Sequence, residues 1–596
     1  MSGLRSITFG FVAAVCAASA YLLYPAPADS ANARVVAAAD DGGFDLIPPT
    51  VADLYITART QDSQGNNALL AVTYAANQAL PASLPLQVGG RQATLVRDSQ
   101  NPQRYTAVIA FDFDAFLAEQ TRRQQLAPSK PWVPRFDGRE HIGDAPWAFL
   151  DPAQLRSDIA RQVAIRIPRD VLLGPPIAIS APRSLMVVHP LVVEDPTRTY
   201  DACTNTGNPN GAWTFNKLMT DMANQPVTGV DPSDFVAQWL LTHAGASTVN
   251  GYTVDGSPAF SQILSEWPRL SGGKLNLAKS PMRLLAIVNR VDLRTNSAYG
   301  GGSAGEGRFV FGVIRPMTGG GCQEVPLTVI LEYGVPKLGC PAVRSYAQQW
   351  AGLSTLVLGS SGYNAALQAL TDQFALANAS PGKPNRSAIN QVRTNEEPWH
   401  PFWDWRQRED QLITAGPWLR PATTKQTPDR SFNTTASASP RLPQYVNANA
   451  PAILAGTYRV PQIYAGTRFL GGDTVTEPYW QHNLIANNNA RHKFSLNTCG
   501  ACHGPETDTD FTHIAPRASG AQAALSSFLT GAPAGGTLDA PMTYTLPDPA
   551  VPTTLRSYGD LAFRQSHLST LASSSCPSGG LFTELHFFPI AMSATH

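Results

Sequence analysis

Three apolar runs near the middle of the chain decide its architecture: Leu284-Leu-Ala-Ile-Val-Asn-Arg-Val291, Arg308-Phe-Val-Phe-Gly-Val-Ile314 and Leu327-Thr-Val-Ile-Leu331. Each run is short and rich in β-branched or aromatic residues, which predicts a buried β-strand. Segments with helical spacing of apolar residues lie before and after them, at 213–222, 234–243, 342–356 and 363–377. Residues 200–382 are therefore expected to form a mixed α/β domain.

The chain has a different pattern on either side of this domain. From residue 51 to residue 193, short alternating runs are separated by Asn, Gly and Pro, which is typical of a small β-sandwich. Residues 383–596 are rich in Pro, Asn, Thr and aromatic side chains, with helices expected only near 520–529 and 558–571. The sequence thus predicts a multidomain α+β protein with an N-terminal β-sandwich, a central α/β domain and a loop-rich C-terminal region.

The first 33 residues have the composition of a secretion signal. Arg5 gives a positive start, residues 7–24 are apolar, and Ala18-Ser-Ala20 or Ala31-Asn-Ala33 would suit a signal peptidase. An uncleaved membrane anchor is the alternative, but residues 10–24 are short for a span of about 20 residues. We expect a periplasmic or extracellular protein, with a linker at 34–50 and no stable membrane span after cleavage.

The charge balance argues against a nucleic-acid partner. The chain has 596 residues with 44 Lys or Arg and 44 Asp or Glu, and its formal net charge is zero. No basic run gathers on one stretch, whereas proteins that bind phosphate backbones concentrate basic side chains. An apolar fraction of 43% is ordinary for globular proteins, so a sizeable core is expected.

Export changes the interpretation of the cysteines. Of the seven, Cys16 is removed with the signal, and thiols in an oxidising compartment tend to be bridged or used for other chemistry. Cys322 and Cys340 flank one strand-like run, which suggests a local bridge. Cys203 would then pair with Cys576 over a long distance. Cys499 and Cys502 belong to a separate motif.

That motif is Cys499-Gly-Ala-Cys502-His503. Covalent attachment of haem requires two thiols that reach the two vinyl groups and an imidazole directly after them to ligate the iron, and C-x-x-C-H meets this requirement. The sequence therefore predicts one covalent haem c, with Cys499 and Cys502 as attachment points and His503 as the proximal ligand. Export places the motif where such cytochromes are assembled.

Two alternatives to haem remain for this motif. A thioredoxin-like dithiol would place it at a strand–helix junction, but the preceding residues 491–498 are mostly polar. A zinc site would need two more ligands, such as His492, His513 or His567, and the chain has no second cysteine pair at zinc-ribbon spacing.

The second axial ligand of the iron has three candidates. His513 lies ten residues after the motif, and Met542 follows Pro541. Methionine raises the reduction potential of a haem relative to histidine, so the choice affects function. An open or water-filled site would instead permit ligand binding or peroxide chemistry. We rank His513 first, Met542 second and the open site third.

Several runs resemble one family of exported myxobacterial and proteobacterial proteins that carry a single cytochrome c-type CxxCH motif. They are Phe494-Ser-Leu-Asn-Thr-Cys-Gly-Ala-Cys-His-Gly-Pro-Glu-Thr507, Phe511-Thr-His-Ile-Ala-Pro-Arg517, Leu525-Ser-Ser-Phe-Leu-Thr-Gly531, Arg283-Leu-Leu-Ala-Ile-Val-Asn-Arg-Val-Asp-Leu-Arg294, Gly305-Glu-Gly-Arg-Phe-Val-Phe-Gly312 and Arg393-Thr-Asn-Glu396. The resemblance covers residues 200–575 and excludes the β-rich front end. It implies haem and export, it implies no substrate, and it mildly favours His513.

Charged residues interrupt the apolar strands. They are Arg290, Asp292, Glu306, Arg308 and Glu332. Because buried charges are usually paired, Arg290 or Arg308 is expected to pair with Glu332 or Asp292. A structural ion-pair network is the first interpretation, and an active site lining a cleft beside the haem is the second.

These observations favour a monohaem cytochrome c-type protein that binds haem and transfers single electrons. Its partner would be a redox protein or a small-molecule electron donor or acceptor. One alternative is a haem-dependent oxidoreductase that acts on peroxide, oxygen or an organic substrate. The other is a structural or surface-binding protein without haem, in which the CxxC cysteines form a disulfide. Catalytic residues are not identified, and enzymatic activity stays open.

Overall fold

The computed structural model describes residues 177–574 apart from 296–303, 318, 339, 398–405, 434–439, 455, 457, 476–478, 505 and 510, together with the strands that precede residue 177. The proposed signal peptide at 1–33 lies outside the described residues, as does Cys576. Strand β1 (Phe44–Ile47) falls within the predicted linker and pairs with β8 (Ile165–Pro168). The chain divides into two compact units, the first mainly within residues 1–164 and the second mainly within residues 165–596.

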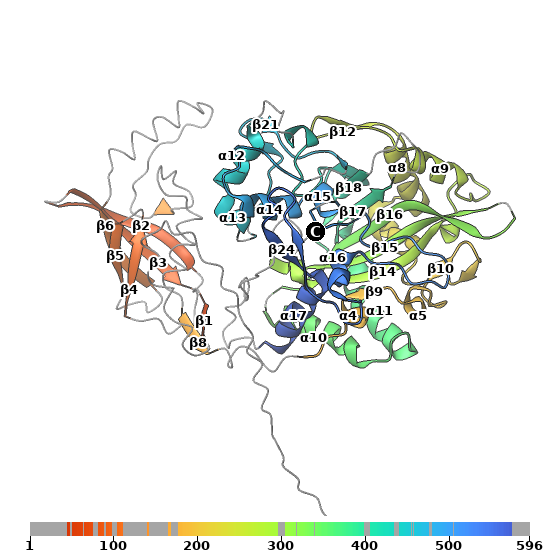
Figure 1. Ribbon diagram of the computed structural model, residues 1–596, viewed down its shortest axis with the longest axis horizontal. Coiled ribbons are helices and arrows are strands. Elements are labelled where there is room, and N and C mark those ends of the chain that lie inside the picture. The colour runs from red at the N-terminus through yellow and green to blue at the C-terminus, as the bar shows by residue number, and fades with distance from the viewer. Residues whose placement is uncertain are drawn as a thin grey trace, which may run out of the picture. The chain divides into compact units, whose positions relative to one another are not determined.

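The first unit contains a β-sheet, as the alternating sequence pattern predicts. Six strands lie in the order β4-β5-β6-β3-β2-β7 (Figure 1). Their bounds are β2 Val51–Asp62, β3 Gly65–Tyr74, β4 Ser83–Val88, β5 Arg91–Arg97, β6 Arg104–Ala110 and β7 Glu140–His141. The strands of this unit that the structure describes form one sheet, and the second layer of the expected sandwich stays a prediction.

The second unit is built on an antiparallel sheet of eight strands. Their order is β19-β18-β17-β16-β15-β14-β9, and β22 pairs with β18. The bounds are β9 Met186–Val187, β14 Met282–Arg290, β15 Glu306–Pro316, β16 Cys322–Gly334, β17 Ile389–Glu396, β18 Arg406–Ile413, β19 Gly416–Ala422 and β22 Thr474–Val475. The three apolar runs are β14, β15 and β16, which confirms the mixed α and β content that they predict.

This sheet takes strands from both sides of the predicted boundary at 382–383. Strand β17 pairs with β16 through Leu331↔Val392, and β18 pairs with β17 through Arg393↔Glu409. The sequence of β18, Arg406-Gln-Arg-Glu-Asp-Gln-Leu-Ile413, resembles a solvated loop. Its buried charges are compensated by ion pairs across the sheet, such as Arg393 with Glu409 at 3.2 Å.

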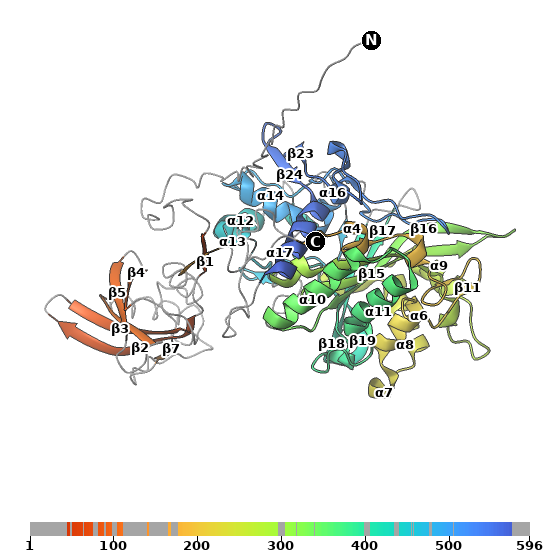
Figure 2. The ribbon, with the colours of Figure 1, turned by 90° about the horizontal axis from the view of Figure 1, so that it is seen from below.

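One face of the sheet is apolar and is covered by helices α6 (Phe215–Ala223), α8 (Pro232–Ala244) and α11 (Ser361–Ala375). The ring centroids of Phe311 and Phe215 lie 5.5 Å apart, and those of Phe309 and Phe374 lie 6.1 Å apart. Figure 2 shows these helices on one side of the sheet and α14, α16 and α17 on the other. Because side chains alternate along a strand, the residues between these aromatics face the C-terminal segment.

Local signals set the helix ends. Asp231 is the N-cap of α8, accepting a hydrogen bond from the Ser233 amide, and Ser360 caps α11 through the Tyr363 amide. The remaining helices are α4 Ala181–Ser184, α5 Pro190–Val193, α7 Gln225–Thr228, α9 Pro258–Glu266, α10 Cys340–Gly352, α12 Arg441–Ala448, α13 Ala450–Leu454, α14 Asn488–Leu496, α15 Cys499–Cys502, α16 Ser527–Thr530 and α17 Asp560–Ser573.

Small hairpins complete the second unit: β10 Tyr200–Asp201 with β11 Thr206–Gly207, β12 Ser247–Val249 with β13 Tyr252–Val254, β20 Ile463–Tyr464 with β21 Thr467–Arg468, and β23 Tyr544–Pro547 with β24 Leu555–Tyr558. The C-terminal region also has an aromatic core of its own. Tyr445 and Phe469 pack against each other with centroids 5.3 Å apart, and Phe494 of α14 lies 6.0 Å from Trp480. This core fixes α14, which leads directly into α15.

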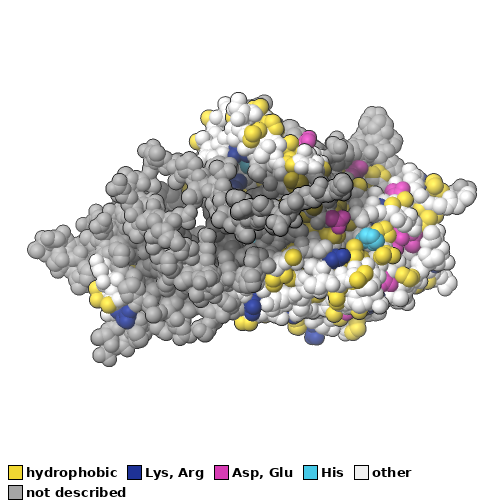
Figure 3. Space-filling view, turned by 60° about the horizontal axis from the view of Figure 1, so that its bottom comes forward, with side chains coloured by type: hydrophobic (Ala, Val, Ile, Leu, Met, Phe, Trp, Pro, Cys, Tyr) yellow, Lys and Arg dark blue, Asp and Glu magenta, His cyan; other side chains and the backbone are white. Residues whose placement is uncertain are grey.

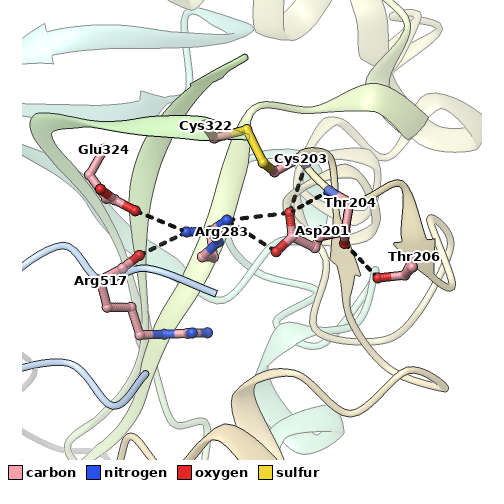
Figure 4. The surroundings of a disulfide bond; sticks show 8 residues. All are labelled: Asp201, Cys203, Thr204, Thr206, Arg283, Cys322, Glu324 and Arg517. Atoms are coloured by element: carbon pink, nitrogen blue, oxygen red, sulfur yellow. Dashed lines mark hydrogen bonds and ion pairs between the residues drawn. A yellow bond between two sulfur atoms is a disulfide. The ribbon is translucent and has the colours of Figure 1, made fainter. Parts of the chain in front are cut away.

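The structure corrects the predicted disulfides. Cys203 is bonded to Cys322, and their Cα atoms lie 5.7 Å apart (Figure 4). The predicted Cys322–Cys340 and Cys203–Cys576 bridges are therefore wrong. Cys322 begins β16, whereas Cys340 lies beyond its other end, and a strand of this length spans about 40 Å. The hairpin β10–β11 instead brings Cys203 to the start of β16.

Among the residues that the structure describes, none of the helices combines the length and the apolar character needed to traverse a bilayer. On the part of the surface visible in Figure 3, acidic and basic side chains are interspersed with apolar ones. This agrees with the balanced charge of the sequence.

Candidate functional site: the CxxCH turn above the sheet

The CxxCH motif forms a single helical turn that is buried. Helix α15 consists of Cys499 to Cys502, and His503 follows at its C-cap. Neither cysteine forms a disulfide with another described residue, and both have almost no exposed surface. The Cys499 amide donates a hydrogen bond to Thr427 Oγ1 at 2.9 Å, and the Cys502 amide donates to the Thr498 carbonyl at 3.1 Å. The turn is thus fixed by its own backbone and by a neighbouring loop.

His503 is held as one neutral tautomer. Its Nδ1–H donates to the backbone carbonyl of Phe511, and Gln407 donates an amide N–H to Nε2 at 2.9 Å. Burial lowers the pKa of His503 to about 4. The imidazole is therefore uncharged at neutral pH and carries its lone pair on Nε2. A carbonyl partner on the other ring nitrogen is the usual arrangement of a metal-ligating histidine.

The structure brings His513 next to His503. Their ring centroids lie 4.4 Å apart, and His513 Nε2 lies 3.7 Å from Cys502 Sγ. His513 Nδ1 pairs with Ser526 Oγ at 2.8 Å. Burial, reinforced by the nearby His503, lowers the pKa of His513 well below its usual range. Both imidazoles are thus neutral, with His503 buried and His513 half-buried.

Met542 is placed differently. Its side chain is 45% exposed, and its backbone amide donates to the Thr530 carbonyl at 3.0 Å. It follows the short turn at Ala532–Ala534 and does not line the cavity that His503 and His513 share. Of the two named candidates for the second axial ligand, the structure brings only His513 to the motif.

The loop that carries His513 is anchored at several points. Thr512 Oγ1 donates to Glu397 at 2.9 Å, and Ile514 forms a β-bridge with Leu525. Arg517 Nη2 donates to the Leu284 carbonyl of β14 at 2.9 Å. In return, Arg283 Nη1 donates to the Arg517 carbonyl at 2.8 Å, beside the disulfide (Figure 4). These contacts fix His513 relative to the sheet.

Both histidines line a cavity over the polar face of the sheet, with a volume of about 70 Å³. This is below the range of roughly 300–1,000 Å³ that is common for ligand and cofactor sites, so the cavity as it stands holds a small group and not a whole haem. Alternate residues of β14 to β17 form its floor, and α16 and α17 contribute to its walls. The lining residues are Met186, Val288, Arg290, Arg308, Val310, Thr328, Ile330, Glu332, Arg393, Asn395, His503, His513, Ile514, Phe528, Leu529 and Arg564.

Ion pairs organise the charged part of the cavity floor. Arg290 pairs with Asp292 at 2.9 Å, and Arg308 pairs with Glu332 at 3.2 Å, which confirms the expected pairing. Glu332 also pairs with Arg393 at 3.2 Å. The two arginines lower the pKa of Glu332 against the effect of burial, so its carboxylate is ionised.

Arg393, Gln407 and Arg564 are not among the site residues that the sequence predicts. Arg393 and Gln407 lie on strands whose polar sequences resemble loops, and Arg564 reaches the cavity from a helix 61 positions after His503. For Arg393, the alternation of Gln391, Arg393 and Asn395 with smaller or apolar residues along β17 was the available signal, and β18 shows no such alternation. No local signal identifies Arg564.

The surroundings of the thiols disfavour a reactive dithiol. Burial raises the pKa of Cys499 to about 11, although Arg393 Nη1 lies 3.2 Å from its sulfur, and burial also raises the pKa of Cys502. Cysteines that act as redox nucleophiles have lowered pKa values. The thiols here are protonated at neutral pH.

The geometry also disfavours zinc. Across the described part of the chain, one group of His, Cys, Asp or Glu brings three ligand atoms within 4.8 Å of one another, and it is His492, Glu506 and Asp548. Arg491 already pairs with Glu506 at 3.0 Å and with Asp548 at 2.9 Å, so this group is a structural ion-pair cluster. The cysteines and histidines of the motif form no such group.

The donor set fits a c-type haem. Two cysteines outside any disulfide lie on one helical turn, and a neutral imidazole follows them directly beside the cavity. The observed distance between the two imidazole rings is too short for both to bind one metal. With metal–nitrogen bonds of about 2 Å, imidazoles on opposite sides of one metal have centroids roughly 6 Å apart. His513 would have to move away from His503 by about 2 Å to become the second ligand.

Comparisons with protein-family models, with curated proteins and with solved structures find no match to the chain.

Proposed function

We propose that this protein is an exported monohaem c-type cytochrome that transfers single electrons. Cys499 and Cys502 would hold one haem through thioether bonds, and His503 would be its proximal ligand. The observation that carries the proposal is the state of His503, whose Nδ1–H donates to the Phe511 carbonyl while Nε2 carries the lone pair. Cys499 and Cys502 directly precede this imidazole, which is the arrangement that covalent attachment of a c-type haem requires.

His513 and Gln407 would also take part in binding the iron. His513 is the candidate for the second ligand, because it lies beside His503 and its ring is held by Ser526 at 2.8 Å. Gln407 is bonded to His503 Nε2 at 2.9 Å and would have to release it when iron binds. The haem would supply the one-electron redox change, while the chain supplies ligands, burial and orientation.

The wider assignments belong to the same proposal. We infer that the chain is a member of the exported myxobacterial and proteobacterial family that its motifs resemble, with a signal peptide at 1–33 and a periplasmic or extracellular location. The N-terminal region would be a β-sandwich, and the haem region would use a redox protein or a small electron donor or acceptor as its partner.

The direct test is to produce the full chain in a host that assembles c-type cytochromes. We expect the purified protein to gain the mass of one haem, to retain it through acid–acetone extraction and to give one haem per chain in the pyridine haemochrome assay. The Cys499→Ala/Cys502→Ala variant should be colourless, whereas the matched Cys203→Ala/Cys322→Ala variant should keep the haem. A wild-type protein without added mass from such a host would refute the proposal.

The cavity gives a haem enzyme some support as a second candidate. The space beside His503 and His513 is lined by Arg290, Arg308 and Arg393 as well as by apolar side chains, and so could admit a small substrate. A high-spin spectrum that cyanide or carbon monoxide shifts would favour an enzyme. A low-spin spectrum that these ligands leave unchanged would favour electron transfer.

A further inference from the structure

Arg564 is a buried cation with hydrogen-bonding capacity left over. It projects from α17 into the cavity and is 4% exposed. Its Nη2 lies 2.7 Å from Asp560 Oδ2, one turn earlier on the same helix. Its Nε and Nη1 are both buried and have no hydrogen-bond partner among the residues that the structure describes. Buried guanidinium donors are normally satisfied, so these two point to a missing acceptor.

The other arginines of the cavity are used differently. Arg290 donates to Asp292 through Nε at 3.1 Å and Nη2 at 2.9 Å. Arg308 donates to Glu306 through the corresponding atoms and pairs with Glu332 through Nη1 at 3.2 Å. They provide a positive background for Arg564 while their own donors are directed at protein carboxylates. Arg393 is likewise directed at Glu332 and Glu409, each at 3.2 Å. Among the cavity arginines that the structure describes, Arg564 has two donors that are available to an additional acceptor.

The cavity walls define the chemistry of that acceptor. Val288, Val310, Ile330, Phe528 and Leu529 supply apolar surface on the same cavity that Arg564 lines. A ligand that satisfies both parts carries an anionic oxygen group on an apolar body. A planar carboxylate matches a guanidinium better than a neutral carbonyl does, because the hydrogen bonds are charge-assisted.

We propose that Arg564 binds a carboxylate group inside this cavity. Two sources share this chemistry: a propionate of the covalently attached haem, which rests on the proposed function, or a free small carboxylate, which does not. The carboxylate accepts from Nη1 or from Nε of Arg564, which point to opposite sides of the guanidinium, while Nη2 stays paired with Asp560.

The first arm of the test uses the full chain produced without haem, with acetate as the probe. Acetate should raise the melting temperature, with the logarithmic dependence on its concentration that binding to one site in the folded state gives. Acetamide, which has the same shape without the charge, should not. Sodium chloride at equal ionic strength controls for salt effects. In Arg564→Gln the affinity for acetate should fall by about tenfold or more, as expected when a charge-assisted hydrogen bond is lost. Arg564→Lys, which keeps the charge, should retain part of the affinity.

The second arm uses the haem-loaded protein and identifies the source. If a propionate occupies Arg564, acetate no longer binds, and Arg564→Gln lowers the reduction potential because a cation beside the haem is removed. Arg564→Lys should keep a potential close to that of the wild type. If the ligand is a free carboxylate, acetate still binds the loaded protein, and Arg564→Gln weakens that binding. Both outcomes support a carboxylate on Arg564 and differ only in its origin.

Arg556 provides the matched control. It is also buried and paired, at 2.7 Å, with Asp548, but it does not line the cavity. Arg556→Gln should alter neither acetate binding nor the potential. The inference is overturned if acetate leaves the haem-free chain unaffected and Arg564→Gln leaves the potential of the loaded protein unchanged. If no haem attaches, the proposed function fails, while the acetate arm still decides the role of Arg564.

Discussion

The imidazole rings of His503 and His513 lie with their centroids 4.4 Å apart above the polar face of the central sheet, with His503 buried and His513 half-buried. Each has its Nδ1 bonded to the chain, His503 to the Phe511 carbonyl and His513 to Ser526 Oγ. Two neutral rings in contact tolerate this proximity, whereas two imidazolium ions would repel each other. The contact therefore requires that both rings stay neutral.

Replacing His513 should change the spin state of the haem-loaded protein. If His513 is the second ligand, His513→Ala leaves the iron with His503 alone, and the low-spin spectrum should become high-spin. Met542→Leu should leave the spectrum unchanged, because the Met542 side chain is 45% exposed and lies outside the cavity. Optical and electron paramagnetic resonance spectra check both variants.

The converse result would be equally informative. A high-spin Met542→Leu protein beside a low-spin His513→Ala protein would assign the methionine as ligand. It would also require the loop after Gly531 to rearrange when haem binds.

A second prediction concerns His567 and the pH dependence of stability. Burial, reinforced by Arg294, lowers the pKa of His567 to about 4 from 6.5. Between these values the unfolded chain binds a proton that the folded chain does not, so stability falls as the pH drops from 6.5 to 4. The loss is about 1.4 kcal/mol per pH unit for one histidine.

His567→Gln should reduce by one the number of protons that the chain takes up on unfolding in this pH range. Urea unfolding of the haem-free chain at several pH values between 4 and 6.5 should give a shallower slope for the variant than for the wild type. Above pH 7 the two slopes should coincide, because neither form of His567 takes up a proton there. Equal slopes below pH 6.5 would mean that His567 is protonated in the folded chain.

The sequence predicts the central strands β14 to β16 well, because each strand places ordinary apolar residues on at least one buried face. It does not reveal β17 and β18, whose polar residues are buried through cross-strand ion pairs such as Arg393 with Glu409. Local sequence patterns contain no information about such partners. The CxxCH motif can be recognised because its functional residues are adjacent in the sequence. Arg564 cannot be recognised in this way, because it reaches the cavity from a distant helix.

The disulfides illustrate the same limit. A bridge between Cys322 and Cys340 follows from proximity in the sequence, but the strand between them keeps them apart. The observed partner, Cys203, is 119 residues from Cys322, and the hairpin that presents it has only two residues in each strand. Tertiary contacts of this kind cannot be obtained from spacing.

The disulfide gives a third prediction. Cys203→Ala/Cys322→Ala should lower the free energy of unfolding by about 2–5 kcal/mol, because the bond closes a long loop in the unfolded chain. Non-reducing tryptic digests should contain a peptide with Cys203 linked to one with Cys322. Cleavage after Lys337 separates Cys322 from Cys340, so the two pairings give different masses. A linked Cys322–Cys340 peptide would contradict the structure.

The last prediction concerns Arg517, which ties the His513 loop to the sheet. Its side chain is buried, pairs with Glu194 and donates to the Leu284 carbonyl at 2.9 Å. Arg517→Ala should cost about 2–4 kcal/mol of stability, because a buried carbonyl and a carboxylate lose their donor. Arg269→Ala is the control, since Arg269 is exposed and donates to two nearby backbone carbonyls, those of Gly273 at 2.7 Å and Leu264 at 3.2 Å.

A position-specific measurement separates anchoring from general destabilisation. Hydrogen exchange of Arg517→Ala should show the largest loss of protection at residues 511–517, and the haem-loaded variant should become a mixture of high-spin and low-spin forms because His513 is no longer fixed. Arg269→Ala should resemble the wild type in both measurements. If Arg517→Ala lost stability evenly across the unit and stayed fully low-spin, Arg517 would be a general structural residue, and the position of His513 would depend on Thr512 and the Ile514–Leu525 bridge instead.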